Sequence, residues 1–315
     1  MVVTLLYTDS FFQEHKTGAH PETERRLSAI ETALSASGLV AKCSRPKIES
    51  AAAQSLENIH TSAVAKRAAQ VAGGGGGYLD PDTVVSQKSY DVALAAAGSA
   101  AAAVRHVIRG DDLNALCLIR PPGHHATRDH SMGFCLFNNV AYAARVAQEE
   151  FGLERILIVD WDVHHGNGTQ DIFYDDPSVV FYSIHRHPFY PGTGKDDETG
   201  TGDGLGATVN VPVAFGTPRA QYLDMFQRGL EKAAARAKPQ LVLISAGFDA
   251  HHDDPIGGLG LSTDDFATLT NAVKQVADTY AQGRIVSCLE GGYDLPALGA
   301  SVTAHLAALL ATSAT

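Results

Sequence analysis

Residues 156–168, ILIVDWDVHHGNG, constrain the fold of this chain more than any other segment. The four aliphatic residues at 156–159 are typical of a strand that is buried on both faces of a parallel sheet. The Gly-Asn-Gly sequence at 166–168 allows the backbone to turn sharply into a helix. Between them, within six positions, lie four potential metal ligands: Asp160, Asp162, His164 and His165. We therefore predict a buried strand with a polar end.

The alternation of side chains along a strand predicts a metal site at this polar end. If the strand continues to about residue 162, Asp160 and Asp162 lie on one face, and His164 joins them if the chain stays extended. Buried carboxylates and an imidazole are unfavourable unless they bind something, and a divalent metal is the obvious candidate. Asp160 or Asn167 alone would be a helix cap, so this segment by itself leaves a metal site and a cluster of caps as alternatives.

An apolar run, a polar end and a helix recur along the chain, which is typical of an α/β fold. Further strands are predicted at residues 2–7, 115–119, 179–184, 241–244 and 285–289. Helices are predicted at residues 22–37, 57–71, 88–109, 138–151, 218–237, 262–282 and 295–311. The pattern predicts a single domain over residues 1–315, with a mostly parallel β-sheet flanked by helices on both faces. Such sheets bind ligands beyond the carboxyl ends of their strands.

Composition argues against several classes of protein. The net charge of -11 disfavours nonspecific binding to nucleic acid or to an anionic membrane. The four cysteines are too scattered for a disulfide framework or a Cys-x-x-Cys metal motif. The amino terminus lacks the basic region and the apolar length of a signal peptide, and no segment is expected to span a membrane. We therefore expect a cytoplasmic protein.

A second strand end supplies a third metal ligand. Asp249 follows the predicted strand at 241–244, and with Asp162 and His164 it gives two carboxylates and one imidazole. This set, with a fourth position open to water, fits a catalytic zinc site, where the metal lowers the pKa of bound water and polarises a carbonyl. Iron(II) or cobalt can also occupy such a site, so the residues leave the metal open.

Acid–base groups are predicted beside the metal. His124 and His125 lie on a loop that is constrained by the Pro-Pro-Gly at residues 121–123, and they could act as general base and general acid. Asp160 could accept a hydrogen bond from one imidazole and raise its basicity. Tyr293 follows two glycines and could donate a hydrogen bond to a developing oxyanion. These groups predict metal-assisted hydrolysis of an amide or an ester.

Five segments together resemble the signature of histone deacetylases, and the class II branch with its bacterial relatives is the most similar. The segments are RPPGHH (120–125), GFCLFNN (133–139), VDWDVHHGNGTQ (159–170), SAGFDAHHDDPIGG (245–258) and LEGGYD (289–294). Their order and spacing also fit, and the resemblance runs from about His20 almost to the end of the chain. It implies the arginase–deacetylase fold and a zinc site formed by Asp162, His164 and Asp249.

The resemblance also implies roles for the acid–base residues. His124 would pair with Asp160, and His125 would pair with Asn167, at a position where class I members have an aspartate. The amide should leave His125 less basic, as suits a proton donor to the leaving amine. Tyr293 matches the catalytic tyrosine of active members, which implies a competent enzyme.

Potassium sites are implied as well, because family members bind this ion through backbone oxygens and a few side chains. The positions that match one site are Asp160, Asp162, His164, Ser183 and Ile184. The positions that match a second site are Phe173, Asp176 and Val179.

The resemblance further implies a tunnel for the acyl-lysine side chain. Phe134 and Tyr190 match its aromatic walls, and Gly133 and Gly291 match residues that line it. Asp82 matches the rim residue that holds the substrate backbone. A turn residue beside a proline is an equal alternative for Asp82.

The implied substrate is an acetylated or otherwise acylated lysine in a protein or peptide. Polyamine-selective eukaryotic relatives have a glutamate after the Asp-Pro that is Asp254-Pro255 here, and this chain has the apolar Ile256. An acetylpolyamine or another small acylated amine stays an alternative, as does a non-catalytic acyl-lysine binding module. A ureohydrolase would need a second metal, typically bound by Asp-x-Asp where this chain has Asp249-Ala250-His251. Hydroxamate-type inhibitors are expected to bind the zinc, and the oligomeric state is not predicted.

Overall fold

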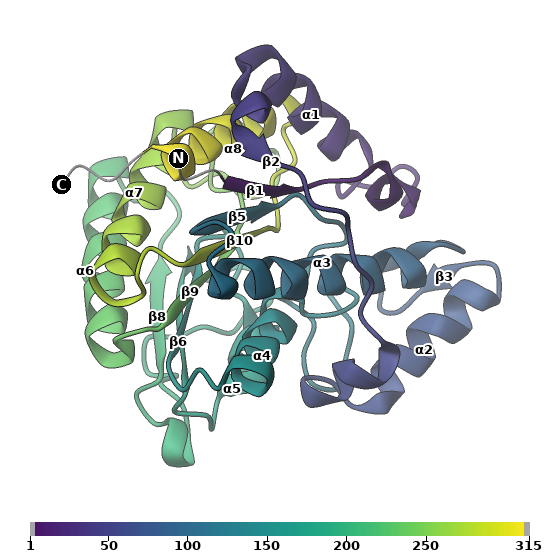
Figure 1. Ribbon diagram of the computed structural model, residues 1–315, viewed down its shortest axis with the longest axis horizontal. Helices are drawn as coiled ribbons and strands as arrows, with labels where there is room; N and C mark the ends of the chain where they lie inside the picture. The colour runs from purple at the N-terminus through teal and green to yellow at the C-terminus, as the bar shows by residue number, and fades with distance from the viewer. Residues whose placement is uncertain (1–3, 312–315) are drawn as a thin grey trace.

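Eight parallel strands form one sheet in the spatial order β2-β1-β5-β10-β9-β6-β7-β8 (Figure 1). The computed structural model describes residues 4–311. Its strands are β1 (Thr4–Tyr7), β2 (Cys43–Ser44), β5 (Asn114–Cys117), β6 (Ile156–Asp160), β7 (Val179–Arg186), β8 (Thr208–Val213), β9 (Leu241–Ala246) and β10 (Ile285–Leu289). The predicted parallel sheet is therefore confirmed, except that residues 2 and 3 of the expected first strand lie outside the described part.

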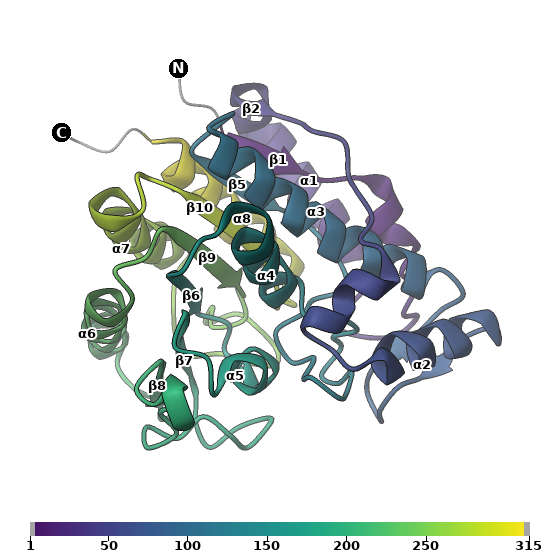
Figure 2. The ribbon, with the colours of Figure 1, turned by 60° about the horizontal axis from the view of Figure 1, so that its bottom comes forward.

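Helices cover both faces of the sheet, as Figure 2 shows. One layer contains α3 (Ser89–Arg109), α4 (Asn139–Phe151) and α5 (Asn167–Phe173), which contact β5, β9 and β7 respectively. The other layer contains α1 (Arg25–Ser37), α6 (Arg219–Ala237), α7 (Thr263–Tyr280) and α8 (Leu295–Leu310). A further helix and a short hairpin complete the chain: α2 (Ser62–Gly73), β3 (Gly77–Tyr78) and β4 (Val84–Val85). The predicted three-layer α/β/α architecture is confirmed.

Strand β6 supports the polar end that the sequence singled out. Its residues 156–159 have no exposed surface, and the strand pairs with β9 on one side and β7 on the other. It ends at Asp160, two residues earlier than expected, because the chain turns there and the N–H of Asp162 donates to Asp160 Oδ1 at 3.1 Å. Asp160 lies opposite Ser183 of β7 and Ser245 of β9, so β6 and β9 end side by side while β7 continues to Arg186.

The sequence does not predict the two edge strands. In β8, TVNVPV, Asn210 and Pro212 interrupt the apolar pattern. The edge position tolerates the proline, because one side of an edge strand needs no hydrogen-bond partner. The other edge strand, β2, has two residues, too few for a periodic signal. Two helices also begin later than predicted, α1 at Arg25 and α2 at Ser62. Before α2, residues 53–58 form a separate 3-10 helix.

Helix α3 bears on the expectation that no segment spans a membrane. By length and composition alone it could cross a membrane, since an 18-residue window has a mean hydropathy of 1.3. However, 72% of that window is buried inside the structure, and α3 contacts α4, β5 and β10. Its alanines allow close packing, and a Cβ atom at Gly98 would collide with the backbone of residues 49–51. The apolar composition of α3 is therefore explained by its place in the core.

A buried ion cluster joins the amino-terminal segment to the carboxyl edge of the sheet. The Glu22 carboxylate accepts hydrogen bonds from Arg120, including one of 2.7 Å from Nη2, and from Arg26 Nη1 at 3.1 Å. Burial opposes ionisation of Glu22, but the Arg120 charge outweighs it and holds the pKa of this carboxyl well below its usual range. Arg26 also donates to the carbonyl oxygens of Glu290 and Gly292, so the cluster supports the loop after β10.

Glu22→Gln should destabilise the protein by about 3–5 kcal/mol, because it leaves two buried guanidinium groups without their shared negative charge. Chemical denaturation of the purified variant measures this loss. Glu24→Gln is the matched control, since Glu24 contacts Lys16 at the surface, and its effect should stay within about 0.5 kcal/mol. Equal stability of the two variants would contradict the role given to the cluster.

Candidate active site

Three potential metal ligands meet beyond the carboxyl ends of β6 and β9. Asp162 and His164 follow β6, Asp249 follows β9, and one ligand atom of each lies within 4.8 Å of the others. His164 Nδ1 is 3.0 Å from Asp162 Oδ1 and 3.2 Å from Asp249 Oδ2. Within residues 4–311, no hydrogen bond reaches Asp249 Oδ2, although this carboxylate oxygen is buried. A divalent cation would compensate it, so the donor set fits the predicted metal.

Backbone groups from neighbouring loops fix the two carboxylates. Asp162 Oδ2 accepts a hydrogen bond from the N–H of Gly291, and Asp249 Oδ1 accepts one from the N–H of Val163, both at 2.8 Å. A Cβ atom at Gly247 or Gly291 would collide with the carboxylates. Glycine at these positions therefore allows the loops after β9 and β10 to approach the metal ligands closely.

A pair of histidines lies next to the metal ligands. His124 Nδ1 is 2.9 Å from Asp160 Oδ2, and His125 Nδ1 is 2.7 Å from Asn167 Oδ1. The two rings are 4.0 Å apart between centroids, and both side chains are buried. When each Nδ1 carries the donated proton, Nε2 of a neutral ring can accept another. The structure thus places both predicted histidines beside the partners that the sequence indicated.

The pKa values of these histidines shift in opposite directions. Burial lowers the pKa of His124, but Asp160 and neighbouring carboxylates outweigh burial and raise it to about 10. Burial also lowers the pKa of His125, and the adjacent His124 and His164 lower it further, well below its usual range. Titratable neighbours with opposite shifts are typical of an acid–base pair in an active site.

Glu290 supports the histidine loop, a role that the sequence did not reveal. Its Oε2 accepts hydrogen bonds from the N–H groups of Gly123 at 2.7 Å and His124 at 3.2 Å. Its Oε1 accepts one from the Ser245 hydroxyl at 3.2 Å. Burial raises the pKa of Glu290 to about 7. The available signal was a single carboxylate directly after the apolar strand 285–289, but its partners are distant in sequence.

A cavity of about 210 Å³ opens above the metal ligands. It is lined by Asp82, Pro122, His124, His125, Gly133, Phe134, His164, Phe189, Tyr190, Ile256, Gly291 and Tyr293. All six residues predicted to contact substrate are in this set, while Pro122 and Phe189 were missed. Phe189 stacks on His164, with ring centroids 5.1 Å apart, and Tyr190 contacts the edge of His125 at 5.1 Å. The cavity therefore runs between aromatic rings to His164, one of the three predicted metal ligands.

Asp82 lines this cavity and also forms part of a turn. It lies in a turn where Asp80 Oδ1 accepts hydrogen bonds from the N–H groups of Asp82 and Thr83. Burial and the neighbouring Asp80 raise the pKa of Asp82 to about 6. Within the described residues, its Oδ1 is buried and has no hydrogen-bond partner.

The positions of the first predicted potassium site lie together. Asp160 and Ser183 are paired in the register of β6 and β7, and Ile184 follows in β7. The loop that carries Asp162 and His164 runs beside the end of β7, where the N–H at residue 186 donates to the carbonyl at residue 163.

The second set of positions lies elsewhere, between the end of α5 and the start of β7. The N–H of Asp176 donates to the carbonyl of Phe173 at 3.1 Å, and Val179 begins β7. Arg145 contacts the Asp176 carboxylate at 2.6 Å, which leaves mainly backbone oxygens for a cation.

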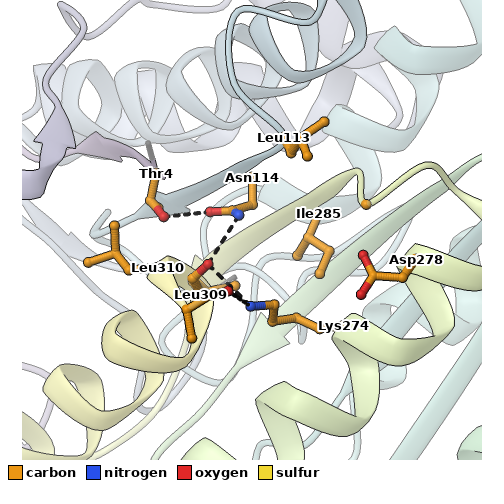
Figure 3. Close-up of a pocket in the computed structure, with 10 residues that line it drawn as sticks. Thr4, Leu113, Asn114, Lys274, Asp278, Ile285, Leu309 and Leu310 are labelled. Carbon is orange, nitrogen blue, oxygen red and sulfur yellow. Dashed lines mark hydrogen bonds between the residues drawn. The ribbon is translucent and has the colours of Figure 1, made fainter. Parts of the chain in front are cut away.

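Another cavity, of about 230 Å³, lies at the opposite edge of the sheet (Figure 3). Thr4, Asn114 and Ile285, the first residues of β1, β5 and β10, line it. Its polar groups are used within the fold. Lys274 donates to the carbonyl of Ala308 at 2.7 Å, and Asn114 accepts a hydrogen bond from the Thr4 hydroxyl and donates one to the carbonyl of Leu309 in α8. The groups with potential catalytic roles therefore lie at the other end of the strands, beyond their carboxyl ends.

Comparisons with known proteins agree with this arrangement. The profile of the family described as "Histone deacetylase domain" matches residues 20–309. The chain belongs to this family. A related deacetylase-family protein, the histone deacetylase-like amidohydrolase of Pseudomonas aeruginosa, is 38% identical over 290 residues, which cover 91% of this chain and 76% of the relative.

Two further comparisons cover nearly the whole chain of this deacetylase-family protein. "Histone deacetylase 10, chloroplastic" of Oryza sativa subsp. japonica is 37% identical over 323 residues, covering 97% of this chain and 73% of the relative. The crystal structure of the HDA15 HD domain has a TM-score of 0.91 at 36% identity, covering 98% of this chain and 90% of that chain. The fold and the family are thus shown independently of the site geometry.

Metal loading of this deacetylase-family protein should release about one proton at pH 7, because the metal needs a neutral imidazole. Burial lowers the pKa of His164, but the adjacent carboxylates of Asp162 and Asp249 raise it from 6.5 to about 9. Apparent zinc affinity should therefore rise with pH up to about 9 and then level off. Calorimetric titration in buffers of different ionisation enthalpy measures the release, and Asp249→Ala should abolish binding. An affinity that does not change between pH 6.5 and 9 would contradict this assignment.

Proposed function

We propose that the protein is a zinc-dependent deacetylase that hydrolyses the amide of an acylated lysine in a protein or peptide. The observation that carries the proposal is the position of His164, which lies within 3.2 Å of the carboxylates of Asp162 and Asp249 and lines an aromatic cavity. Zinc prefers nitrogen and oxygen donors of this kind, and it would supply Lewis acidity there. The aromatic rings of the cavity suit the apolar stem of a lysine.

The two histidines would divide the proton transfers. A neutral His125 can accept a proton from water at Nε2 and return it to the leaving amine, while Asn167 holds the opposite side of the ring. The raised pKa of His124 favours a cation, which would stabilise negative charge as it develops on the substrate. The Asp160 carboxylate holds His124 in this orientation.

Tyr293 would donate a hydrogen bond to the oxyanion. Burial and the charge of Asp249 raise the pKa of its hydroxyl well above the usual value, so the phenol keeps its proton. The ring is perpendicular to that of Phe134, with centroids 6.0 Å apart, and it lies 5.1 Å from the Arg26 guanidinium carbon. Tyr293 lines the cavity, so its hydroxyl could donate to a substrate there.

Tyr293→Phe should lower kcat roughly 100- to 1,000-fold and leave zinc content unchanged, because only one oxyanion donor is removed. Steady-state kinetics on an acetyl-lysine peptide and metal analysis of the same preparation measure the two quantities. Full turnover of the variant would remove Tyr293 from the mechanism.

Potassium forms a further part of the proposal. The first set of positions, around Asp160 and Ser183, lies directly behind the metal ligands, where a bound cation would compensate buried negative charge. The second set is proposed on backbone oxygens near Phe173 and Asp176.

A small acylated amine is the second candidate substrate, and Asp82 is the observation that favours it. The Asp82 carboxylate belongs to a residue of the cavity lining and could bind a distal ammonium group. Asp254, in contrast, accepts hydrogen bonds from four backbone N–H groups and has no oxygen left for a ligand ammonium. The apolar Ile256 at the cavity and the occupied Asp254 both favour the acyl-lysine substrate.

Zinc-loaded protein should hydrolyse an acetyl-lysine peptide with a higher kcat/KM than acetylputrescine. Ile256→Glu should shift this ratio toward acetylputrescine by about tenfold, because it adds a carboxylate at the cavity. A higher value for acetylputrescine with the unmodified protein would move the function to small amines. Binding of the peptide without turnover, or binding in the absence of zinc, would favour an acyl-lysine binding module. A hydroxamate should compete with the peptide only when zinc is present.

A further inference from the structure

The Asp254 carboxylate makes four hydrogen bonds to backbone groups. Its Oδ1 accepts from the N–H groups of Ile256 at 2.9 Å and Gly257 at 3.0 Å. Its Oδ2 accepts from the N–H groups of Tyr293 at 2.7 Å and Asp294 at 3.3 Å. Asp254 is only 9% exposed and is not among the residues that line the cavity. Its contacts therefore indicate a structural role rather than direct contact with substrate.

These bonds join two loops that both reach the cavity. Ile256 belongs to the loop after β9, Tyr293 belongs to the loop after β10, and both side chains line the cavity. Gly292, which precedes Tyr293, has a φ of +121°, a conformation that side chains rarely adopt. The glycines before Tyr293 leave its direction weakly restrained by the local backbone, so the hydrogen bond at its own N–H becomes important.

A carboxylate is well suited to this position. Hydrogen bonds from N–H groups to an ionised carboxylate are stronger than those between neutral groups, and two oxygens can serve two loops at once. The bonds to Ile256 and Gly257 form a turn closed by the aspartate side chain, and Pro255 restricts the backbone within it. An amide here would direct its NH2 group at one pair of N–H donors.

We propose that Asp254 is a positioning residue that directs Tyr293 into the cavity and ties it to Ile256 at the substrate end. The proposal rests on the proposed role of Tyr293 as oxyanion donor. A displacement of about 1 Å in a catalytic group can lower the rate roughly 100-fold, so this restraint bears directly on turnover. The restraint also couples the position of Ile256 in the cavity wall to the position of Tyr293.

The neighbouring Asp253 provides a matched control. Its side chain is 59% exposed, and its carboxylate lies near the imidazoles of His251 and His252 rather than near either loop N–H pair. Asp253→Asn removes the same charge one residue away and leaves the bonds to Tyr293 and Ile256 in place.

The first test follows the hydrogen bonds and needs no activity. Hydrogen–deuterium exchange with mass spectrometry on the full chain should show faster exchange of residues 255–258 and 292–295 in Asp254→Asn, and no change in Asp253→Asn. Unchanged exchange in Asp254→Asn would overturn the proposal. This readout separates it from the proposed function, because it gives the same answer for an inactive protein.

The second test is a double-mutant cycle on zinc-loaded protein with an acetyl-lysine peptide. Asp254→Asn should lower kcat about 10- to 100-fold with unchanged zinc content, and in the Tyr293→Phe background the same change should cost less than about threefold. Equal losses in both backgrounds, or loss of zinc, would overturn the proposal, because Asp254 would then act through another group. If Asp254→Asn does not fold, Asp254→Glu replaces it in both tests, since it keeps the charge and alters only the reach of the oxygens.

Discussion

Four carboxylates are buried close together at the carboxyl ends of β6, β9 and β10, and the arrangement of the site depends on how they are compensated. They belong to Asp160, Asp162, Asp249 and Glu290. An ionised group left alone in a protein interior is strongly unfavourable, so each must find a donor or a cation. Imidazoles, a hydroxyl and backbone N–H groups donate to both oxygens of Asp160, Asp162 and Glu290, whereas one oxygen of Asp249 receives no hydrogen bond from the described residues and is left for a metal.

This requirement explains the glycine-rich loops around the site. A loop can offer an N–H group to a buried carboxylate only if its backbone approaches closely, which excludes a Cβ atom at Gly247 and Gly291. The loop after β10 is also held by Arg26, whose charge is balanced by Glu22. The carboxylates also separate the pKa values of the two histidines. They outweigh burial and raise the pKa of His124, whereas burial and the charge of His124 lower the pKa of His125.

The compensated carboxylates leave a site with distinct parts for metal, proton transfer and substrate. Asp254 belongs to the loop framework rather than to the substrate surface, since all its accepting capacity is used by backbone N–H groups. Asp82 differs, because it is among the residues that line the cavity. The distinction between these two aspartates bears on whether a lysine stem or a polyamine fits the cavity better, and it comes from hydrogen bonds rather than from residue type.

The sequence by itself determined the parallel sheet, the polar strand ends and the residues gathered there, because buried strands and helix starts have local patterns. The run of Ile156–Asp160 and the motifs around His124 and Tyr293 are examples. Strand β8 was not predicted, because Pro212 interrupts its apolar pattern and a proline is acceptable there only at the edge of the sheet. The tertiary structure alone decided that Glu22 neutralises Arg120 across 98 positions and that Asp254 binds the N–H of Tyr293 across 39. Such partners are chosen by the packing of distant loops, which leaves no periodic signal in the chain.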